Sequence, residues 1–196
     1  MTSSAFAHLV ETQKSSQEVF KGRFLHAFRD AVTLPDGNEA TREYVVHPGA
    51  VMIIPLLQDA MGNRRVVLER QYRYPVGQVM IEFPAGKLDP GESVATCAQR
   101  ELLEETGYTA NKWSYIRRIH PVISYSTELI DIYLAEDLVP GKSKLDDEEF
   151  LDVFAAPLEQ LIAWVEEGEI TDVKTTISAY WLDRYRRGLV KPQPIE

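Results

Sequence analysis

The segment from residue 86 to residue 108, GKLDPGESVATCAQRELLEETGY, constrains this chain more than any other part of its sequence. Seven glycine and charged residues occupy a fixed register in it: Gly86, Glu92, Arg100, Glu101, Glu104, Glu105 and Gly107. Average composition gives each such residue roughly a 5–7% chance at a given position, so the register would arise by accident in roughly one chain in a million. We therefore expect the segment to form one functional unit.

The middle of this segment is predicted to be an α-helix. Ser93 precedes a run rich in Ala, Leu and Glu, as an N-cap residue does, and Gly107 stands where a helix usually ends. Between them, Val94, Ala98 and Leu102 recur every four positions. This spacing places the three side chains in one stripe of the helix, which we expect to be buried.

The same helix brings several carboxylates together. Glu101 and Glu105 are four residues apart, so their side chains stack one turn above the other, and Glu104 adds a third carboxylate to that turn. Like charges at this spacing repel each other by roughly a few tenths of a kcal/mol in an isolated helix. Oxygen ligands gathered in this way suit Mg²⁺, which takes few protein carboxylates and completes its shell with water and substrate phosphates.

Residues 86–91 are predicted to be the loop before the helix, since glycine and Asp-Pro are loop formers. Such a loop can fold back over the start of the helix and present backbone oxygens to a metal ion. We expect Glu92 and Arg100 to pair across this junction and fix the carboxylates in place. The alternative is a solvated acidic helix face on which Arg100 makes only a surface ion pair, and the complete register with its flanking glycines disfavours it.

Length and composition indicate a globular chain of ordinary enzyme size. The 196 residues, 44% of them hydrophobic, suffice for one domain with a sizeable core and a small appendage. No apolar run approaches the length that spans a membrane, and the first residues lack the features of a signal peptide. The single cysteine, Cys97, cannot form an internal disulfide, which favours a reducing compartment, and we expect the cytoplasm.

The net charge of −9 argues against a nucleic-acid partner. The sequence holds no basic patch beyond Arg184, Arg186 and Arg187, near the C-terminus. An acidic chain can still bind a small diphosphate, because a metal ion and a few local arginines supply the positive charge. We therefore expect a small-molecule substrate, no nucleic acid and no membrane.

Hydrophobic periodicity and turn residues predict the remaining elements. The expected strands cover residues 18–32, 41–47, 49–57, 65–71, 79–83, 113–120, 128–135 and 150–154. Two further helices are expected at 157–167 and 171–187. Pro55 should lie near an end or edge of its strand, since proline cannot donate to a ladder. The order of elements implies an α/β fold with a mixed sheet packed between helices.

The register at 86–108 resembles the Nudix box, the signature of hydrolases that cleave a nucleoside diphosphate linked to another group. Every charged and glycine position of the box is filled, and only its last position departs, with Tyr108 where an aliphatic residue is usual. The segments VVHPGAV, RQYRYPVG, IEFPAGKLD, SYSTE and GEITDVKT look like the ADP-ribose pyrophosphatase branch of that family. The resemblance covers residues 18 to about 187 and implies a Nudix-type α/β/α sandwich with an N-terminal β-strand extension.

The resemblance also implies two parts with different tasks. Residues 49–196 would form the Nudix hydrolase domain. Residues 1–48 would pair with a second subunit and help to build its adenosine pocket. A small detached sheet is marginal by itself, which agrees with pairing in a two-fold homodimer.

The box residues acquire roles by the same resemblance. Glu101 and Glu105 would bind Mg²⁺ together with the backbone oxygen of Ala85, and Mn²⁺ would substitute for it. Glu104 would be an auxiliary ligand or a support. With Arg100 it is counted among the catalytic residues.

The acidic loop before the last predicted strand is similar to the mobile loop whose glutamate activates the attacking water in this branch. Glu149, directly before Phe150, is the best match to that glutamate. Glu148 is the second choice for the general base, and Glu128 the third. The choice among the three stays open at this point.

Four residues match positions that bind substrate in the family. Arg73 and Arg42 match arginines that hold the phosphates or the terminal ribose, and Glu82 belongs to the IEFPAGKLD segment. Glu128 matches a glutamate near the terminal sugar. Members of the branch usually have Pro-Gly shortly before that glutamate, whereas this chain has VISY at 122–125. That segment discriminates between substrates in the family, so the identity of the sugar stays open.

The expected function is Mg²⁺-dependent hydrolysis of the diphosphate bond of a nucleoside diphosphate sugar, first of all ADP-ribose to AMP and ribose 5-phosphate. Another nucleotide sugar, of the ADP-glucose or GDP-mannose type, is the alternative substrate. A second class of function is a catalytically silent Nudix domain that binds a nucleotide sugar and regulates another protein. The complete set of box acids favours the enzyme.

Overall fold

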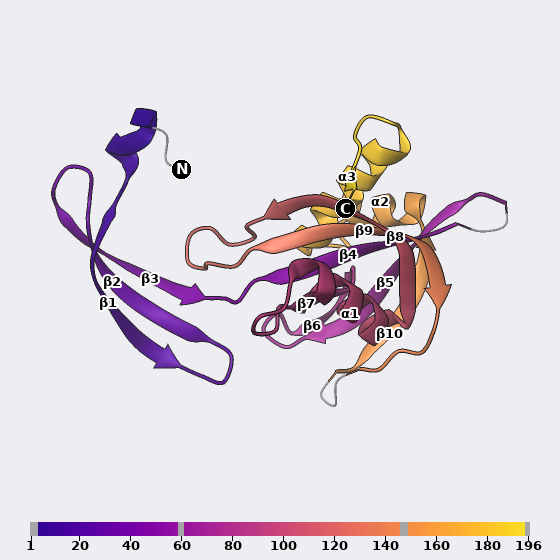
Figure 1. The fold of residues 1–196 in the computed structure, drawn as a ribbon, viewed down its shortest axis with the longest axis horizontal. Helices are drawn as coiled ribbons and strands as arrows, with labels where there is room; N and C mark the ends of the chain where they lie inside the picture. The colour runs from indigo at the N-terminus through magenta and orange to yellow at the C-terminus, as the bar shows by residue number, and fades with distance from the viewer. Residues whose placement is uncertain (1–3, 59–60, 146–148, 195–196) are drawn as a thin grey trace. The chain divides into compact units, whose positions relative to one another are not determined.

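The computed structural model describes residues 4–58, 61–145 and 149–194, and it divides the chain into two units (Figure 1). The first unit consists of Met1–Pro48 and Val122–Glu128, and the second consists of Gly49–Pro121 and Leu129–Glu196. No helix within the described ranges is both long and apolar enough to cross a membrane.

The first unit is built on a three-stranded antiparallel sheet in the order β1-β2-β3. The short 3-10 helix η1 (Ser4–Leu9) precedes the strands β1 (Thr12–Lys21), β2 (His26–Thr33) and β3 (Glu39–Val46). The prediction of one strand over residues 18–32 is wrong. The chain reverses after Lys21, where the N–H of Gly22 donates to the carbonyl of Leu25 at 2.8 Å.

A segment from much later in the sequence completes the first unit. The N–H of Val45 donates to the carbonyl of Tyr125 at 2.9 Å, and the N–H of Thr127 donates to the carbonyl of Val45 at 3.0 Å. The hydroxyl of Thr127 also accepts a hydrogen bond from the N–H of His47 at 2.9 Å. Residues 122–128 therefore lie along β3, although some eighty residues separate them in sequence.

The second unit contains an eight-stranded mixed sheet in the order β10-β5-β4-β9-β8-β11, with β6 paired to β5 and β7 paired to β4. Strands β4 and β9 run parallel, and the other pairs are antiparallel. The strands are β4 (Ala50–Gln58), β5 (Arg64–Arg73), β6 (Gln78–Glu82), β7 (Ala85–Lys87), β8 (Tyr108–Ile119), β9 (Ile130–Pro140), β10 (Leu151–Pro157) and β11 (Gln193–Pro194). The two short strands β7 and β11 were not predicted.

Helices cover both faces of this sheet, and the alternation of side chains along β4 shows how (Figure 1). Val51 and Ile53 belong to the core beneath α1 (Val94–Thr106), whereas Met52 and Ile54 belong to the core shared with α2 (Leu158–Glu166) and α3 (Val173–Arg186). Successive side chains of a strand point to opposite faces, so a strand buried on both sides is apolar throughout. The predicted α/β/α sandwich with a mixed sheet is confirmed.

Pro55 lies inside the central strand β4, so the expectation that it would stand near a strand end or edge is wrong. The parallel ladder between β4 and β9 ends at Pro55, and the antiparallel ladder to β5 begins at Leu56. The missing N–H therefore falls where the strand changes partners. There it disrupts less pairing than it would within one continuous ladder.

Both predicted ends of α1 are confirmed. The Ser93 hydroxyl accepts a hydrogen bond from the Thr96 N–H at 3.1 Å, and Gly107 takes the left-handed conformation with φ of 73°. A side chain at Gly107 would also meet the backbone N of Ser143 at 2.8 Å. Ala98 and Leu102 are fully buried and Val94 packs beside them, as the four-residue spacing predicted.

Candidate active site

Strand β7 and helix α1 bring the two central glutamates of the box together. A Cβ atom at Gly86 would overlap the carboxyl group of Glu101, so only glycine allows this approach of strand and helix. The N–H of the preceding residue, Ala85, donates to Glu105 Oε2 at 3.0 Å. Both glutamates are buried, and the short strand fixes their carboxylates one helical turn apart.

Arg100 binds three glutamates at once, and we call these four residues the Arg100 cluster. Its Nε and Nη2 atoms donate to the two carboxylate oxygens of Glu92, both at 2.9 Å. Its Nη1 atom donates to Glu101 at 2.8 Å and to Glu104 at 2.9 Å. The expected pairing of Glu92 with Arg100 is present. The alternative of an isolated surface pair does not describe Arg100.

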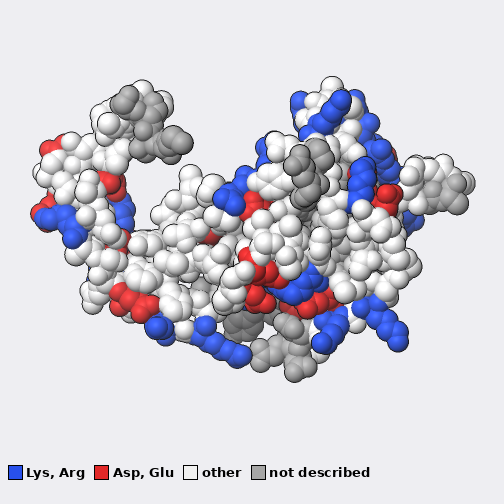
Figure 2. All heavy atoms as spheres, in the orientation of Figure 1, with Lys and Arg blue, Asp and Glu red and all other residues white. Residues whose placement is uncertain are grey.

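The Arg100 cluster changes the acidity of its members. The hydrogen bonds from Arg100 hold the pKa of Glu92 down to about 2, and Glu92 in return raises the pKa of Arg100. Burial raises the pKa of Glu101 to about 7 in spite of the neighbouring Arg100 charge, with Glu104 and Glu149 adding to the rise. Figure 2 shows acidic side chains gathered around basic ones over α1 and β7.

The surroundings of Glu105 are more negatively charged than those of Glu101. Burial raises its pKa well above the ordinary value, and the carboxylates of Glu69, Glu101 and Glu149 raise it further. The hydrogen bond from Ala85 only partly offsets these effects. A group of like charges in a buried place favours a cation among them.

Arg73 and Glu82, two predicted substrate-binding residues, form a two-pronged ion pair. Arg73 Nε donates to Glu82 Oε1 at 2.7 Å, and Arg73 Nη2 donates to Glu82 Oε2 at 3.0 Å. Lys174 from α3 also donates to Glu82, and it lies 3.1 Å from Asp172. Burial alone would raise the pKa of Glu82, but these two cations outweigh it and hold that pKa below its ordinary value.

Lys174 and Glu69 belong to this site although the sequence analysis assigned no role to either. Lys174 lies within GEITDVKT, a segment quoted for the family resemblance, so it could have been found there. Glu69 lies on β5, where an acidic residue interrupts the apolar run VVL. Glu69 is fully buried, and burial with the charge of Glu82 raises its pKa to about 7.

Glu149, the preferred candidate for the general base, is half-buried two residues before β10. Its charge contributes to the raised pKa of Glu69, Glu101 and Glu105. Glu148, the second candidate, lies outside the described residues.

The two remaining predicted residues, Arg42 and Glu128, belong to the first unit. Arg42 Nε donates to Glu11 Oε2 at 2.9 Å, and its side chain is half-exposed on β3. Glu128 lies 3.7 Å from His47, and its N–H donates to the Ser126 hydroxyl at 3.1 Å. The edge of the Phe24 ring packs against His47. Within this unit, Glu128 thus lies near a histidine ring, which itself packs against an aromatic ring.

The residues at β7 and α1 fit a divalent cation. Among the described residues, no three His, Cys, Asp or Glu side chains form a ready-made metal site. Mg²⁺, however, needs only one or two protein carboxylates when water and substrate phosphates complete its shell. Within the described ranges, the buried carboxylate of Glu69 lacks a hydrogen-bond partner, and Gly86 lets the Glu101 carboxyl group approach the backbone of β7 closely. These features suit a hard cation held by oxygen atoms.

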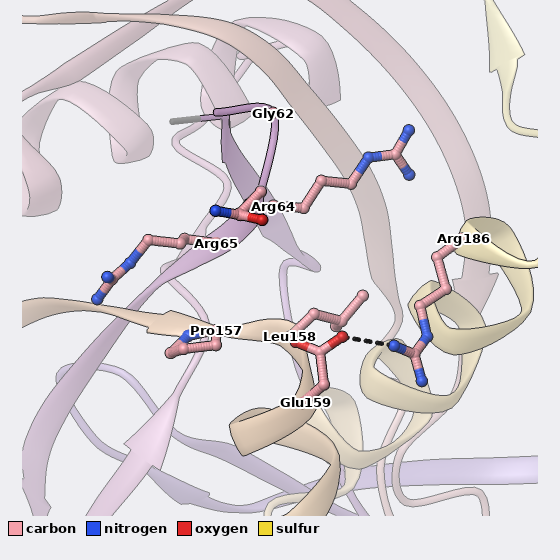
Figure 3. Close-up of a pocket in the computed structure, with 8 residues that line it drawn as sticks. Gly62, Arg64, Arg65, Pro157, Leu158, Glu159 and Arg186 are labelled. Carbon is pink, nitrogen blue, oxygen red and sulfur yellow. Dashed lines mark hydrogen bonds and ion pairs between the residues drawn. The ribbon is translucent and has the colours of Figure 1, made fainter. Parts of the chain in front are cut away.

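A separate open cavity of about 500 Å³ is lined by three arginines, and Figure 3 shows that their side chains diverge around it. Arg186 donates to Glu159 at 2.7 Å, Arg65 donates to the carbonyl of Ala155 at 2.6 Å, and Arg64 stacks over the ring of Tyr185. Its lining includes none of the predicted site residues. Because each arginine already has a partner, we do not assign this cavity to the site.

Comparison with known proteins decides the family. The model of the NUDIX domain matches residues 46–180, and the model of the nucleoside diphosphate sugar hydrolase N-terminal domain matches residues 11–45. The chain belongs to the Nudix family. The predicted family and the assignment to the Nudix hydrolases are thereby confirmed.

Several Nudix relatives resemble this chain over almost its whole length. An ADP-ribose pyrophosphatase of Bacillus subtilis is 34% identical over 89% of this chain and 93% of its own. A methanol dehydrogenase activator of Bacillus methanolicus is 34% identical over 85% of this chain and 89% of its own. The crystal structure of an ADP compounds hydrolase superposes with a TM-score of 0.78 at 25% identity, covering 92% of this chain and 97% of that one.

Proposed function

We propose that this Nudix protein hydrolyses the diphosphate bond of a nucleoside diphosphate sugar, and that it prefers ADP-ribose, which it cleaves to AMP and ribose 5-phosphate. The names of the Bacillus subtilis relative and of the solved structure support this substrate class. The observation that carries the proposal is the packing of Gly86 against the Glu101 carboxylate. It fixes two buried glutamates of a complete box in a position to serve a metal-bound diphosphate.

Glu101, Glu105 and the backbone oxygen of Ala85 would hold Mg²⁺, or Mn²⁺ in its place, with Glu104 as an auxiliary ligand. When bound, the ion neutralises and orients the diphosphate oxygens. Arg100 holds the Glu101 and Glu104 carboxylates in position from the side of the loop, because it is anchored on Glu92.

Glu149 acts as the general base in this proposal. It takes a proton from a water molecule that attacks phosphorus, and the bond between that phosphorus and the bridging oxygen breaks, so that each product leaves with one phosphate. A positioned carboxylate of this kind contributes roughly 10²–10⁴-fold to the rate. The partial burial of Glu149, and the effect of its charge on the pKa of Glu69, Glu101 and Glu105, support the assignment.

Arg73, Glu82, Arg42 and Glu128 are the proposed substrate-binding residues. Arg73 carries a charge suited to phosphate oxygens, and Glu82 fixes the plane of its guanidinium group. The VISY segment at 122–125 selects among sugars, which keeps ADP-glucose and GDP-mannose as alternative substrates.

A turnover panel tests the proposal. The protein is incubated with ADP-ribose, ADP-glucose or GDP-mannose, Mg²⁺ and a coupling phosphatase, which releases phosphate from the monophosphate products but not from the intact diphosphates. We expect the highest kcat/KM with ADP-ribose. Release with another sugar alone would change the substrate but keep the reaction, and no release with any of them would contradict hydrolysis.

The variant Glu105→Gln keeps the size of the side chain and removes its charge. We expect activity to fall about 10²-fold or more with the fold intact, since the metal ion would lose its principal ligand. The matched control is Glu159→Gln, an exposed glutamate on α2. Near-normal turnover of a folded Glu105→Gln protein at limiting Mg²⁺ would rule out this role.

A nucleotide-sugar-binding regulator is the second candidate, and the relative named methanol dehydrogenase activator motivates it. A chain of this kind would bind ADP-ribose but release no phosphate. Calorimetric binding with inactivity in the turnover panel would favour the regulator over the enzyme.

The strands of the first unit pair with a second copy in our proposal, and the protein acts as a cytoplasmic homodimer. Strand β1 is exposed along its whole length, including the apolar Val19 and Phe20, and the unit is a small sheet. Light scattering should give the mass of a dimer at micromolar concentration. A fully active monomer would remove this part of the proposal.

A further inference from the structure

Glu69 is a buried acid whose position is unexplained. Its side chain is fully buried on β5, and neither of its carboxylate oxygens has a hydrogen-bond partner within the described parts of the chain. Buried polar groups are almost always satisfied, and an unpaired buried carboxyl group destabilises a fold. An apolar residue at the same place in the strand would avoid this cost. The group therefore needs a reason to be there.

The neighbouring cationic side chains donate their hydrogen bonds to another carboxylate and not to Glu69. It stands directly opposite Glu82 in the ladder between β5 and β6, so the two side chains lie on one face of the sheet. Arg73, four residues further along β5, also points to that face. Yet Arg73 and Lys174 both donate their hydrogen bonds to Glu82. The charges of Arg73 and Lys174 lower the pKa of Glu69, but neither side chain donates a hydrogen bond to it.

Glu69 lies on the face of the sheet that α1 covers. Its neighbour Leu68 packs in the core shared with α2 and α3, and successive side chains of a strand point to opposite faces. Next to burial, the Glu69 charge is the largest cause that raises the pKa of Glu105. Glu149 acts on both of these residues. Within the described ranges, the two carboxylate oxygens of Glu69 thus lack a hydrogen-bond partner on the face of the sheet that carries Glu105.

We propose that Glu69 is a further divalent-cation ligand, which binds Mg²⁺ or Mn²⁺ together with Glu105. The inference rests on the metal-dependent function proposed above and adds a ligand that lies outside the Nudix box. Two carboxylates suffice for a cation of this kind, because water and substrate phosphates supply its other ligands. The cation would supply the missing partner of both Glu69 oxygens and offset the repulsion between Glu69 and Glu105.

The alternative is a buried acid with a purely structural role, and metal binding without substrate separates the two. We would measure Mn²⁺ binding to the full-length protein by calorimetry and by the electron paramagnetic resonance signal of free Mn²⁺. Thermal melting, with a chelator and with Mg²⁺, gives a second readout. The variants are Glu69→Gln and Glu69→Val, the latter an apolar residue suited to a strand in case the amide impairs folding.

For Glu69→Gln we expect the affinity for Mn²⁺ to fall about 10–100-fold, in the range found when groups that support a bound metal are lost. The rise in Tm that Mg²⁺ causes should shrink accordingly. With chelator, Glu69→Val should melt at or above the temperature of the unaltered protein, because it removes the unpaired charge. Asp152→Asn, an exposed carboxylate on β10, is the control that should leave Mn²⁺ binding unchanged.

Glu105→Gln makes the outcomes distinguishable. If Glu105→Gln weakens Mn²⁺ binding but both Glu69 variants bind Mn²⁺ as the unaltered protein does, Glu69 is not a ligand and the proposed function stands. If Glu105→Gln also binds Mn²⁺ normally, the proposed metal site itself is wrong. If both Glu69 variants unfold even with Mg²⁺, the residue is structural and the inference is overturned.

Discussion

Arg100 and Glu69 both lie beside the buried glutamates of α1, but their surroundings differ. In the Arg100 cluster, one guanidinium group satisfies Glu92 through two hydrogen bonds and reaches Glu101 and Glu104 with a third nitrogen. No group in the described parts of the chain donates a hydrogen bond to Glu69, although the charges of Arg73 and Lys174 act on it. The carboxylates of the Arg100 cluster all have hydrogen-bond partners, whereas the Glu69 carboxylate has none within the described residues.

The difference between the Arg100 cluster and Glu69 indicates which part of the site stabilises the fold and which part binds ligands. A fully satisfied polar network holds its members in a single geometry, whereas an unsatisfied buried carboxylate lowers the stability of the metal-free fold. We infer that the Arg100 cluster positions the box and holds Glu101 for the cation, and that Glu69, Glu105 and Glu149 complete the region that receives the cation and the reacting water. Substitutions in the two regions test this division.

The largest effect is expected at Glu149, on the side without donors. The substitution Glu149→Gln removes the base but keeps the shape, so kcat should fall by about 10²–10⁴-fold while KM and the affinity for Mn²⁺ change little. Steady-state kinetics with ADP-ribose measure the split. Asp152→Asn on the following strand is the control that should keep kcat. If kcat of Glu149→Gln stays normal, the base must be sought at Glu148 and then at Glu128.

The second prediction concerns removal of the guanidinium group of the Arg100 cluster. Arg100→Met keeps the length of the side chain but leaves three glutamates unpaired. Removing one partner of a buried ion pair costs about 3–5 kcal/mol, and since Arg100 is 27% exposed we expect about 2–4 kcal/mol. At about 2–4 °C per kcal/mol for a chain of this size, Tm should fall by about 5–15 °C.

A surface pair in the first unit supplies the control for Arg100→Met. Arg29 pairs with Glu43 on neighbouring strands, and both side chains are more than half exposed. Such pairs contribute about 0–1 kcal/mol, so Arg29→Met should hardly change Tm. An equal fall of Tm in the two variants would mean that the Arg100 cluster is no more than a surface network.

The sequence predicted the Arg100 cluster better than the surroundings of Glu69. Ser93, Gly107 and the pairing of Glu92 with Arg100 depend on residues close together in the chain, where helical spacing and capping rules apply. Glu69 and Lys174 reach the site from β5 and α3, far from the box in sequence. No local rule brings such residues together, because the order of strands in the sheet does so.

The same limit explains the errors in the strands. Strand β1 carries TQKSSQEVFK and is exposed on both faces, so it lacks the alternation of apolar and polar residues that reveals a half-buried strand. It was therefore merged with β2 in the prediction. Strand β4, in contrast, is buried on both faces, and its continuous apolar run was found with nearly correct bounds.

The third prediction concerns pH and the Glu92 carboxylate. Hydrogen bonds from Arg100 hold the folded-state pKa of Glu92 at about 2, below the value of about 4.3 in an unfolded chain. The resulting stabilisation is complete above about pH 4.3 and is lost as the pH falls toward 2. Charge-assisted hydrogen bonds contribute about 1.5–3 kcal/mol, so Glu92→Gln should lower Tm at pH 7 by about 3–10 °C.

Melting curves of Glu92→Gln and the unaltered protein from pH 7 to pH 3 measure this effect. The difference in Tm should be constant down to about pH 4.5 and then shrink, because protonation of Glu92 removes the same charge as the substitution. Glu159→Gln, whose partner Arg186 also binds Asp183, is the control with a small and flat difference. A difference that grows as the pH falls would contradict the assignment of the low pKa to Glu92.

The smallest effect is expected at Glu104, which separates its two suggested roles. Glu104 accepts one hydrogen bond from Arg100 across a single helical turn, and 34% of its side chain is exposed. Pairs of this kind contribute about 0.3–0.5 kcal/mol, so Glu104→Gln should lower Tm by only about 1–2 °C. Arg100 keeps its hydrogen bonds to Glu92 and Glu101 in this variant, so the box geometry survives. As a support, Glu104 should change the affinity for Mn²⁺ by less than about threefold, whereas loss of a ligand would weaken it about tenfold or more. A weakening of Mn²⁺ binding as large as that in Glu105→Gln would therefore show that Glu104 is a metal ligand and not only a support within the Arg100 cluster.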